Sequence, residues 1–438
     1  MQFASTRNPD RLTGFADALL QGLAPDGGLY VPTVWPAFSA VRLPDGSAEC
    51  GSAEVLSALA AQLLAPFVAE SALAPQLAAI AREAFNFPAP LVPLLDSGRL
   101  SVLELFHGPT AAFKDFGARF LAASLVRLRD AAAPPLTILV ATSGDTGGAV
   151  AAAFYERPGI RVAVLFPRGL VSETQERQLT CWGGNVRAFA VRGTFDDCQR
   201  LAKEALRDRE LHTRTDLSSA NSINLGRLLP QTVYYAAASL AISQRWGEPA
   251  CFVIPSGNLG NALACIWARK LGLPIGDVVL AHNANRTVPD FLRTGEWRPR
   301  ASVATLASAM DVGDPSNMER LRALFPAIEE LRQAVHAETV DDAQIRARIR
   351  AGYERFRQIW CPHTATAAEA YARLSEERRR RGRWVLVATA HAAKFREVVE
   401  PLIGRDVPVP ESLARLFERP TSCSEIAPEI EALRRALS

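Results

Sequence analysis

The stretch that decides the fold is His107-Gly108-Pro109-Thr110-Ala111-Ala112-Phe113-Lys114-Asp115-Phe116-Gly117. Lys114 stands between aromatic residues, with the carboxylate of Asp115 beside it. An amine held among apolar side chains loses solvation, so its pKa falls and it becomes available as a nucleophile. Only four of the 49 lysines and arginines are lysines, so each lysine carries more information than usual. Lys114 is therefore the first candidate for a catalytic group.

Such an amine forms a Schiff base with an aldehyde, and pyridoxal phosphate is the cofactor that supplies one. The alternative is that Lys114 is an ordinary exposed lysine at the start of a helix. Lys203 and Lys270 lie in amphipathic helical runs, where we expect surface cations that bury only their alkyl stems. The sequence thus favours Lys114 as the attachment point of the cofactor.

Length and composition indicate a globular protein of two or three domains. The chain has 438 residues, is 48% hydrophobic and carries a net charge of +3, which gives no broad basic surface for nucleic acid. We find no apolar signal segment at the N-terminus and no run of about 20 apolar residues that would span a membrane. The seven cysteines form no Cys-x-x-Cys pair, and the histidines are scattered. We therefore expect a cytoplasmic enzyme without a metal site, bound neither to nucleic acid nor to a membrane.

Hydrophobic periodicity predicts an α/β fold. Residues 1–95 are predicted to form a mainly helical N-terminal domain, with helices at 15–20 and across 53–85. Residues 96–405 alternate short β-branched strands with helices, which is typical of parallel sheets wrapped by helices in a two-lobed catalytic domain. Residues 406–438 are expected to form a helical tail. The predicted strands are 137–141, 161–166, 186–191, 251–254, 277–281 and 384–388.

Two of these strands end in glycine-rich loops that open helices, at 142–148 and 255–261. Small residues at a helix N-terminus favour anion binding, because free backbone N–H groups and the helix dipole both point at the ligand. Neither loop matches a nucleotide-binding glycine motif, and either could be only a tight structural connection. A third strand end, at Thr389, offers a hydroxyl group that could instead cap the following helix.

The segment 221–227 supplies a third polar cluster, ahead of a helix expected to begin near Leu228. It contains asparagine amides, the Ser222 hydroxyl and the Arg227 guanidinium, which can bind a phosphate through two parallel hydrogen bonds. The alternative is an asparagine-rich turn with Arg227 as a surface cation.

Taken together, these residues resemble the threonine synthase family, whose members are fold type II pyridoxal-phosphate enzymes similar to the tryptophan synthase β subunit. The resemblance runs nearly end to end. The Lys114 motif and the segment 19–30 are specific to that family, whereas the glycine loops are shared more widely. The matching motifs are 107–117, Ser143-Gly-Asp-Thr-Gly147, Asn221-Ser-Ile-Asn224, Pro255-Ser-Gly-Asn258, Ala309-Met-Asp311 and Thr389-Ala-His391.

The resemblance implies a role for each motif. Lys114 would be the Schiff-base lysine, and Thr389 would face the pyridine nitrogen of the cofactor. The residues implied for the cofactor phosphate are Gly257, Asn258, Leu259, Gly260 and Asn261. Those implied for the substrate carboxylate are Thr142, Ser143, Gly144, Asp145 and Thr146, with Asp145 also near the phenolic oxygen of the cofactor. Those implied for the substrate phosphate are Asn221, Ser222, Asn224 and Arg227.

The implied reaction is that of a carbon–oxygen lyase in threonine biosynthesis. It converts O-phospho-L-homoserine and water to L-threonine and phosphate by β,γ-elimination and replacement, with Lys114 as the general base for the Cα and Cβ protons. One alternative is a phospholyase or dehydratase that uses the same residues but releases 2-oxobutanoate and ammonia. Another is a cofactor-binding pseudoenzyme with a regulatory role. We expect a small-molecule substrate and a monomer or homodimer.

Overall fold

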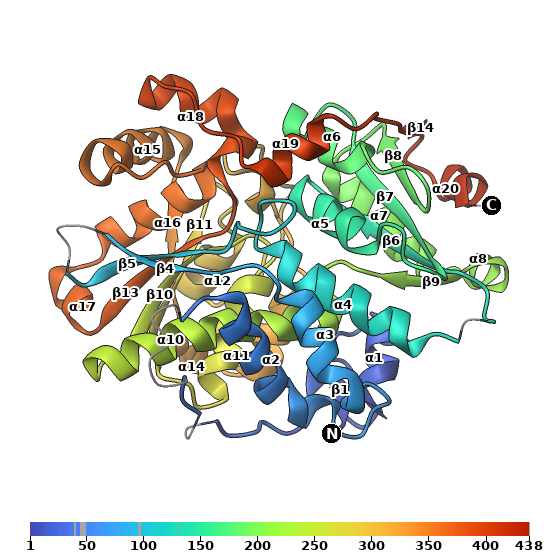
Figure 1. The fold of residues 1–438 in the computed structure, drawn as a ribbon, viewed down its shortest axis with the longest axis horizontal. Coiled ribbons are helices and arrows are strands. Elements are labelled where there is room, and N and C mark those ends of the chain that lie inside the picture. Colours follow the sequence, from blue (N-terminus) through green and yellow to red (C-terminus); the bar gives the residue numbers. More distant parts are fainter. Residues whose placement is uncertain (39–40, 44–49, 95–97, 131, 438) are drawn as a thin grey trace.

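Two lobes lie side by side, each built on a β-sheet, and the N-terminal segment lies beneath them (Figure 1). The computed structural model describes residues 1–438 except 39–40, 44–49, 95–97, 131 and 438. The predicted domain boundary between residues 95 and 96 therefore lies outside the described residues. The predicted α/β class is confirmed.

The N-terminal segment combines helices with a small antiparallel sheet. Its helices are α1 (Phe15–Gln21), α2 (Ala53–Val68) and α3 (Leu77–Ala84), which confirms the predicted helical regions. Its sheet pairs β1 (Phe3–Ser5) with β2 (Leu12–Thr13) and β3 (Tyr30–Pro32). We did not predict these strands, because two or three residues are too few to show an alternating pattern.

A six-stranded sheet forms the lobe on the left of Figure 1, in the order β12-β11-β10-β13-β5-β4. All its pairs are parallel except the antiparallel pair between β4 and β5 at one edge. The strands are β4 (Leu91–Pro93), β5 (Leu100–Glu104), β10 (Ala250–Pro255), β11 (Ile275–His282), β12 (His336–Thr339) and β13 (Arg383–Ala388).

Helices cover both faces of this sheet, so its strands are apolar on both sides. Along β10, Cys251 and Val253 belong to one hydrophobic core, and Phe252 and Ile254 belong to the other. One face carries α15 (Asp342–Phe356), α16 (Pro362–Arg373) and α18 (Arg396–Ile403). The opposite face carries α10 (Thr232–Trp246), α11 (Gly260–Lys270), α12 (Thr287–Thr294) and α14 (Ile328–Ala334). Helices α13 (Met318–Leu324) and α17 (Glu376–Arg380) complete the lobe.

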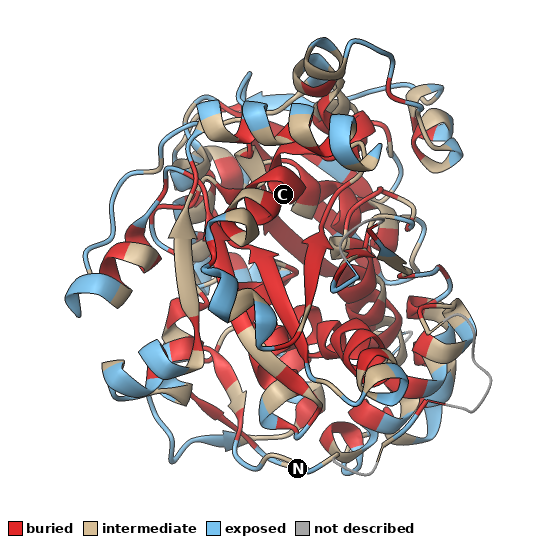
Figure 2. Ribbon diagram, turned by 90° about the vertical axis from the view of Figure 1, so that its left-hand side faces the viewer, coloured by how far each residue is buried: buried red, intermediate tan, exposed pale blue. Residues whose placement is uncertain are grey.

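A five-stranded parallel sheet forms the other lobe, in the order β14-β8-β7-β6-β9. Its strands are β6 (Leu136–Ala141), β7 (Ile160–Pro167), β8 (Val186–Val191), β9 (Asp216–Ser219) and β14 (Ser424–Ile426). The helices around it are α4 (Lys114–Leu128), α5 (Asp145–Phe154), α6 (Glu173–Thr180), α7 (Phe195–Ala205), α8 (Arg209–Arg214), α9 (Leu225–Leu228), α19 (Glu411–Phe417) and α20 (Ile430–Leu437). Figure 2 shows buried strands at the centre and exposed residues on the outer turns of the helices.

All six predicted strands are confirmed, and two local predictions need correction. The tail after residue 405 is not only helical, because β14 lies between α19 and α20 and pairs with β8. The helix expected near Leu228 begins at Leu225 as the short α9, where the Asn224 side chain accepts a hydrogen bond from the Gly226 N–H. A 3₁₀ turn that contains Pro230 separates α9 from α10, since proline cannot continue the hydrogen-bond ladder of a helix.

Candidate active site

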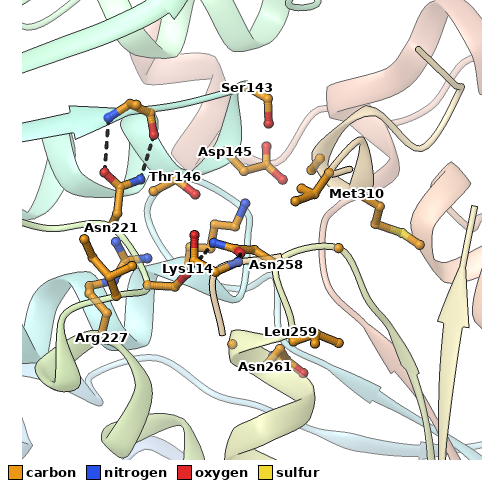
Figure 3. Close-up of a pocket in the computed structure, with 18 of the residues that line it drawn as sticks. Lys114, Ser143, Asp145, Thr146, Asn221, Arg227, Asn258, Leu259, Asn261 and Met310 are labelled. Carbon is orange, nitrogen blue, oxygen red and sulfur yellow. Dashed lines mark hydrogen bonds between the residues drawn. The ribbon is translucent and has the colours of Figure 1, made fainter. Parts of the chain in front are cut away.

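A cavity lies between the two lobes, where several strands end. Figure 3 shows Ser143 and Asp145 on one side of Lys114, and Leu259 and Asn261 on the other. The cavity draws its lining from α4, from the loops that follow β6, β9, β10 and β13, and from α7. The predicted site residues that line it are Lys114, Ser143, Asp145, Thr146, Asn221, Ser222, Arg227, Gly257, Asn258, Leu259, Gly260, Asn261 and Thr389.

Lys114 is placed by a backbone pairing between two distant segments. The Phe113 N–H donates to the Thr389 carbonyl at 2.9 Å, and the His391 N–H donates to the Ala111 carbonyl at 3.0 Å. Ala111 adopts a left-handed φ of 52°, which turns the chain into α4 at Lys114. This pairing brings Lys114 and Thr389 to the same cavity, although 275 positions separate them in the sequence.

The Lys114 amine is a suitable nucleophile. Its Nζ makes no hydrogen bond or ion pair within the described residues, and it lies 5.7 Å from the centre of the Phe113 ring. Burial lowers the pKa of Lys114 to about 8; Asp145 opposes this shift, and the positive charges of Arg227 and Lys394 add to it. A useful fraction of the amine is therefore unprotonated near neutral pH.

Asp115, the carboxylate next to Lys114 in sequence, does not face the cavity. Its Oδ2 accepts the Thr110 N–H at 2.8 Å and its Oδ1 accepts the Thr110 hydroxyl at 2.7 Å. The sequence neighbour of Lys114 thus serves the local turn. The carboxylate that lines the cavity with Lys114 is Asp145.

The loop after β10 is a cradle of free backbone donors. Within the described residues, the N–H groups of residues 257–262 have no hydrogen-bond partner. Leu259 adopts a left-handed φ of 62° at the N-terminus of α11, and a side chain at Gly257 would lie 2.7 Å from the Met310 Cα. Six unpaired N–H groups at the start of an 11-residue helix fit the phosphate of pyridoxal phosphate.

The side chains of this loop hold the loop itself in place. Asn261 accepts a hydrogen bond from the Tyr235 hydroxyl and donates to the Tyr234 hydroxyl at 2.8 Å. Asn258 donates to the Ser222 hydroxyl at 2.9 Å and accepts from the Ser316 N–H at 2.5 Å. Anion binding by this loop would therefore fall to its backbone.

The loop after β6 divides into supporting and lining residues. The Thr142 hydroxyl accepts the N–H groups of Gly144 and Gly147, both at 2.9 Å, and Gly144 has a φ of 137°. Thr142 and Gly144 do not line the cavity, so they shape the loop that presents Ser143, Asp145 and Thr146.

Asp145 is paired with a residue that we did not predict for the site, Lys394. The Lys394 Nζ lies 2.7 Å from the Asp145 Oδ1, and the Lys394 side chain is fully buried. Burial alone would raise the pKa of Asp145, but Lys394 and then Lys114 outweigh it and hold the pKa below its usual range. The scarcity of lysine was a signal that could have identified Lys394 as it identified Lys114.

Arg227 is buried, so the alternative of a surface cation is wrong. It is 2% exposed, one guanidinium nitrogen donates to the Ala220 carbonyl, and its Nε has no partner within the described residues. Burial lowers the pKa of Arg227 to about 10, which leaves it charged at neutral pH. A buried, incompletely satisfied guanidinium beside the cavity fits an anionic ligand.

The two asparagines of this segment support the backbone. Asn221 pairs through its side chain with both backbone groups of Ala141, at 3.2 and 2.7 Å (Figure 3). Asn224 donates to the carbonyls of Leu19 and Ser219 and does not line the cavity. Asn224 therefore fixes the segment to the N-terminal domain and would act on a ligand only indirectly.

Thr389 lines the cavity and does not cap the helix that follows it. The cap is His391, whose Nδ1 accepts the Ala393 N–H at 3.1 Å, so the capping alternative for Thr389 is wrong. His363 also lines the cavity, and its Nε2 accepts the Ala309 N–H at 3.1 Å. Burial lowers the pKa of His363 to about 4, so this histidine is neutral at physiological pH.

Lys203 also lines the cavity, although the sequence suggested an ordinary surface lysine. The face of α7 that lines the cavity carries Lys203 together with Phe195, Gln199 and Ala202. A second pocket, of about 870 Å³, adjoins this cavity, and Gln199 and Lys203 line both. Lys203 makes no hydrogen bond or ion pair with any residue that the structure describes. The sequence of α7 did not indicate that Lys203 lines a cavity. Residues that face a cavity recur along a helix with the same period as residues that face the core.

The described residues offer neither a metal site nor a membrane-spanning helix. No group of three or more His, Cys, Asp and Glu side chains there could hold a metal ion. None of the described helices is both long and apolar enough to cross a membrane.

The fold and the site together define a pyridoxal-phosphate-dependent enzyme. Residues 85–390 match the family model described as pyridoxal-phosphate dependent enzyme. Residues 2–85 match the model for the threonine synthase N terminus, and residues 364–437 match the model for its C-terminal part. The chain belongs to the threonine synthase family.

Similar proteins cover the whole chain. The threonine synthase of Serratia marcescens is 39% identical over 100% of this chain and 99% of that protein. The crystal structure of threonine synthase from Escherichia coli superposes with a TM-score of 0.89 at 36% identity, covering 100% of this chain and 99% of that one. The structure of threonine synthase with bound pyridoxal phosphate from Brucella melitensis has a TM-score of 0.88 at 33% identity, covering 100% and 98%. Pyridoxal phosphate is the cofactor of this family.

Proposed function

We propose that this chain converts O-phospho-L-homoserine and water to L-threonine and phosphate, with the cavity between the lobes as its active site. The observation that carries the proposal is a pair of separate anion-binding features beside one unpaired amine. The free N–H groups of residues 257–262 form one feature, and the guanidinium of Arg227 forms the other. A phosphorylated cofactor together with a phosphorylated substrate needs two such features.

The cofactor would be held by residues on three elements. The backbone of residues 257–261 would bind its phosphate, Lys114 would attach its aldehyde carbon, and Thr389 would present a neutral hydroxyl to its ring nitrogen. When bound, pyridoxal phosphate supplies an electron sink for the negative charge that develops when a carbon loses a proton. A neutral hydroxyl at the ring nitrogen, in place of a carboxylate, moderates that sink and favours elimination over transamination.

Lys114 would move the protons. With the substrate amine in place of Lys114, the free Lys114 amine would accept the Cα proton, pass it on, and then accept a Cβ proton, since the amine carries one extra proton at a time. Its pKa of about 8 suits both steps, because the same group must accept protons and release them near neutral pH. Phosphate would then leave Cγ, which would take up a proton in its place. Water would add its hydroxyl group at Cβ and give its remaining proton to the released phosphate, and Cα would regain its proton.

The substrate would be held at both ends. Ser143 and Thr146 line the cavity where we propose that the substrate carboxylate is recognised, and Asp145 lines it where we propose that the cofactor's phenolic oxygen lies. Arg227 and Ser222 lie at the other feature, where the substrate phosphate would bind. Few water molecules would reach the bound substrate, because the site is buried: Arg227 is 2% exposed and Thr389 is 5% exposed.

The test is an assay of the purified protein on O-phospho-L-homoserine with all products quantified. We expect threonine and phosphate in equal amounts. If 2-oxobutanoate and ammonia dominate, the phospholyase or dehydratase alternative holds; if neither product forms while the cofactor is bound, the pseudoenzyme alternative holds.

The proposal includes a cytoplasmic location and a monomeric or homodimeric state. All seven cysteines are free thiols, which agrees with a reducing compartment. Sedimentation of the purified protein decides the oligomeric state.

A further inference from the structure

Lys394 is a second buried lysine close to the cavity that contains Lys114, and the proposed mechanism does not use it. Lys394 is 0% exposed, and its Nζ lies 2.7 Å from the Asp145 Oδ1 and 3.0 Å from the Thr110 carbonyl oxygen. An ammonium group in such a position costs solvation energy unless it is paired. In a chain with four lysines, a fully buried one calls for a physical reason.

Both partners of Lys394 are themselves held in place. The Gln175 side chain donates to the same Asp145 oxygen at 3.0 Å, and Gln178 donates to the Thr110 carbonyl at 3.1 Å. The Lys394 carbonyl accepts a hydrogen bond from the Ser172 hydroxyl at 3.3 Å. Since Ser172, Gln175 and Gln178 come from α6 and its N-cap, Lys394 ties the loop after β13 to the other lobe.

Two amines therefore face one carboxylate, and only one of them is paired with it. Lys114 lines the same cavity as Asp145, yet its Nζ has no hydrogen-bond or ion-pair partner in the described parts of the chain. The other charged or titratable groups near these three side chains are Arg227, His363, Asp115, Cys361, His391 and Lys203. If Asp145 were free, it would be the natural counter-ion of Lys114 and would keep that amine protonated.

We propose that Lys394 is a positioning residue that holds the Asp145 carboxylate away from Lys114 and so leaves the Lys114 amine free to react. It acts in two ways. Its hydrogen bond fixes one oxygen of Asp145, and its positive charge adds to that of Arg227 in disfavouring an ammonium at Lys114. The proposal rests on the proposed function only in taking Lys114 as the reacting amine.

The charges give a definite sign for each substitution. Removal of Lys394 takes away a positive charge and releases Asp145, and both changes raise the pKa of Lys114. Removal of the Asp145 charge takes away the group that favours the ammonium, which lowers it. When both charges are removed together, the two effects oppose each other and that of Asp145 is the larger, so the pKa of Lys114 should lie between those of Asp145→Asn and the parent.

The test measures the pKa of Lys114 in the cofactor-free protein, from the pH dependence of its labelling by acetic anhydride and peptide mass spectrometry. The variants are Lys394→Met, Asp145→Asn and the two combined. Lys394→Arg tests rescue by a retained charge, and Lys270→Met makes the same substitution at an exposed lysine. We expect the pKa of Lys114 to rise by about one unit in Lys394→Met, to fall in Asp145→Asn, and to lie between Asp145→Asn and the parent in the double variant. Lys394→Arg should stay near the parent, and Lys270→Met should change nothing.

Two results would overturn the proposal. One is a folded Lys394→Met protein in which Lys114 titrates as in the parent. The other is a double variant that titrates like Asp145→Asn alone, since Lys394 would then exert no opposing effect. If Lys394→Met does not fold, the comparison of the double variant with Asp145→Asn still tests the proposal. The double variant is expected to fold because it lacks both members of the buried ion pair and so leaves neither charge unpaired. No substrate is used, so failure here is distinct from a failure to form threonine.

Discussion

Asn258 donates a hydrogen bond of 2.9 Å to the Ser222 hydroxyl, which joins the glycine loop after β10 to the segment that carries Arg227. Asn317 donates to the same hydroxyl at 3.1 Å and to the Asn258 carbonyl at 3.0 Å. The two proposed phosphate sites are therefore neighbours that share one hydrogen-bond network. Their separate roles must be tested by substitutions that change one site and spare this network.

Lys114→Ala should abolish both the visible absorption of the bound cofactor and turnover, because the attachment point and the general base are lost together. Borohydride treatment of the parent, followed by peptide mapping, should place the label on Lys114. Lys270→Ala is the matched control and should keep colour and activity, since Lys270 is exposed. Label on Lys203, Lys270 or Lys394 would refute the assignment.

Arg227→Ala should leave the cofactor absorption intact and lower kcat/KM for O-phospho-L-homoserine by about 2–4 kcal/mol, roughly 30- to 1000-fold. The reason is that a desolvated phosphate loses its charged partner. Arg227→Lys keeps a charge without the two-pronged geometry and should fall between the parent and Arg227→Ala. A colourless Arg227→Ala protein, or one as active as the parent, would show that the substrate phosphate binds elsewhere.

Gly260→Asp should have the reverse effect and purify without cofactor, because a carboxylate at the helix N-terminus repels the cofactor phosphate. Gly260→Ala is the control for added bulk. A Cβ there would lie 3.2 Å from the Ser222 Cβ, a tight contact that both variants share. Cofactor affinity by absorbance titration should fall far more in Gly260→Asp than in Gly260→Ala. Equal losses in the two variants would contradict the charge argument.

Cofactor capture by the cofactor-free protein should depend on pH through Lys114. The pKa of this amine is lowered to about 8, so its reactive neutral form grows as pH rises and dominates above that value. We expect the capture rate to rise up to about tenfold per pH unit below pH 8 and to level off above it. Nα-acetyllysine, whose amine titrates near 10.4, provides the comparison in solution. A protein inflection close to that of the free amine would argue against desolvation of Lys114.

Lys203→Met should raise KM for the phosphorylated substrate roughly fivefold with little change in kcat, the scale of one partly exposed charge. Lys203 lines both the active-site cavity and the pocket that adjoins it, so we expect its charge to attract an anionic substrate. The difference from the parent should shrink at high salt, which screens exposed charges. Lys270→Met should match the parent at every salt concentration.

Much of the fold followed from local patterns. The six predicted strands are mostly β-branched or apolar, because helices cover both faces of the sheets; the charged exceptions are Arg161, Arg187 and Asp277. The strands that we missed are β5, β9 and β12 and the short strands of two or three residues. Asp216–Ser219 and His336–Thr339 are largely polar, so their pairing depends on neighbours that are far away in sequence.

The sequence by itself determined the class of chemistry, since a lysine in an aromatic motif and glycine loops at strand ends are contiguous patterns. Only the tertiary structure decided which charges meet. In the folded protein, Asp115 accepts a hydrogen bond from Thr110, and Asp145 pairs with Lys394, which is 249 positions away in the sequence. Asn224 hydrogen-bonds to the N-terminal domain. The physical reason is that backbone conformation responds to near neighbours. The partner of a buried charge is set instead by the order of strands in the sheets and by the packing of helices between the lobes.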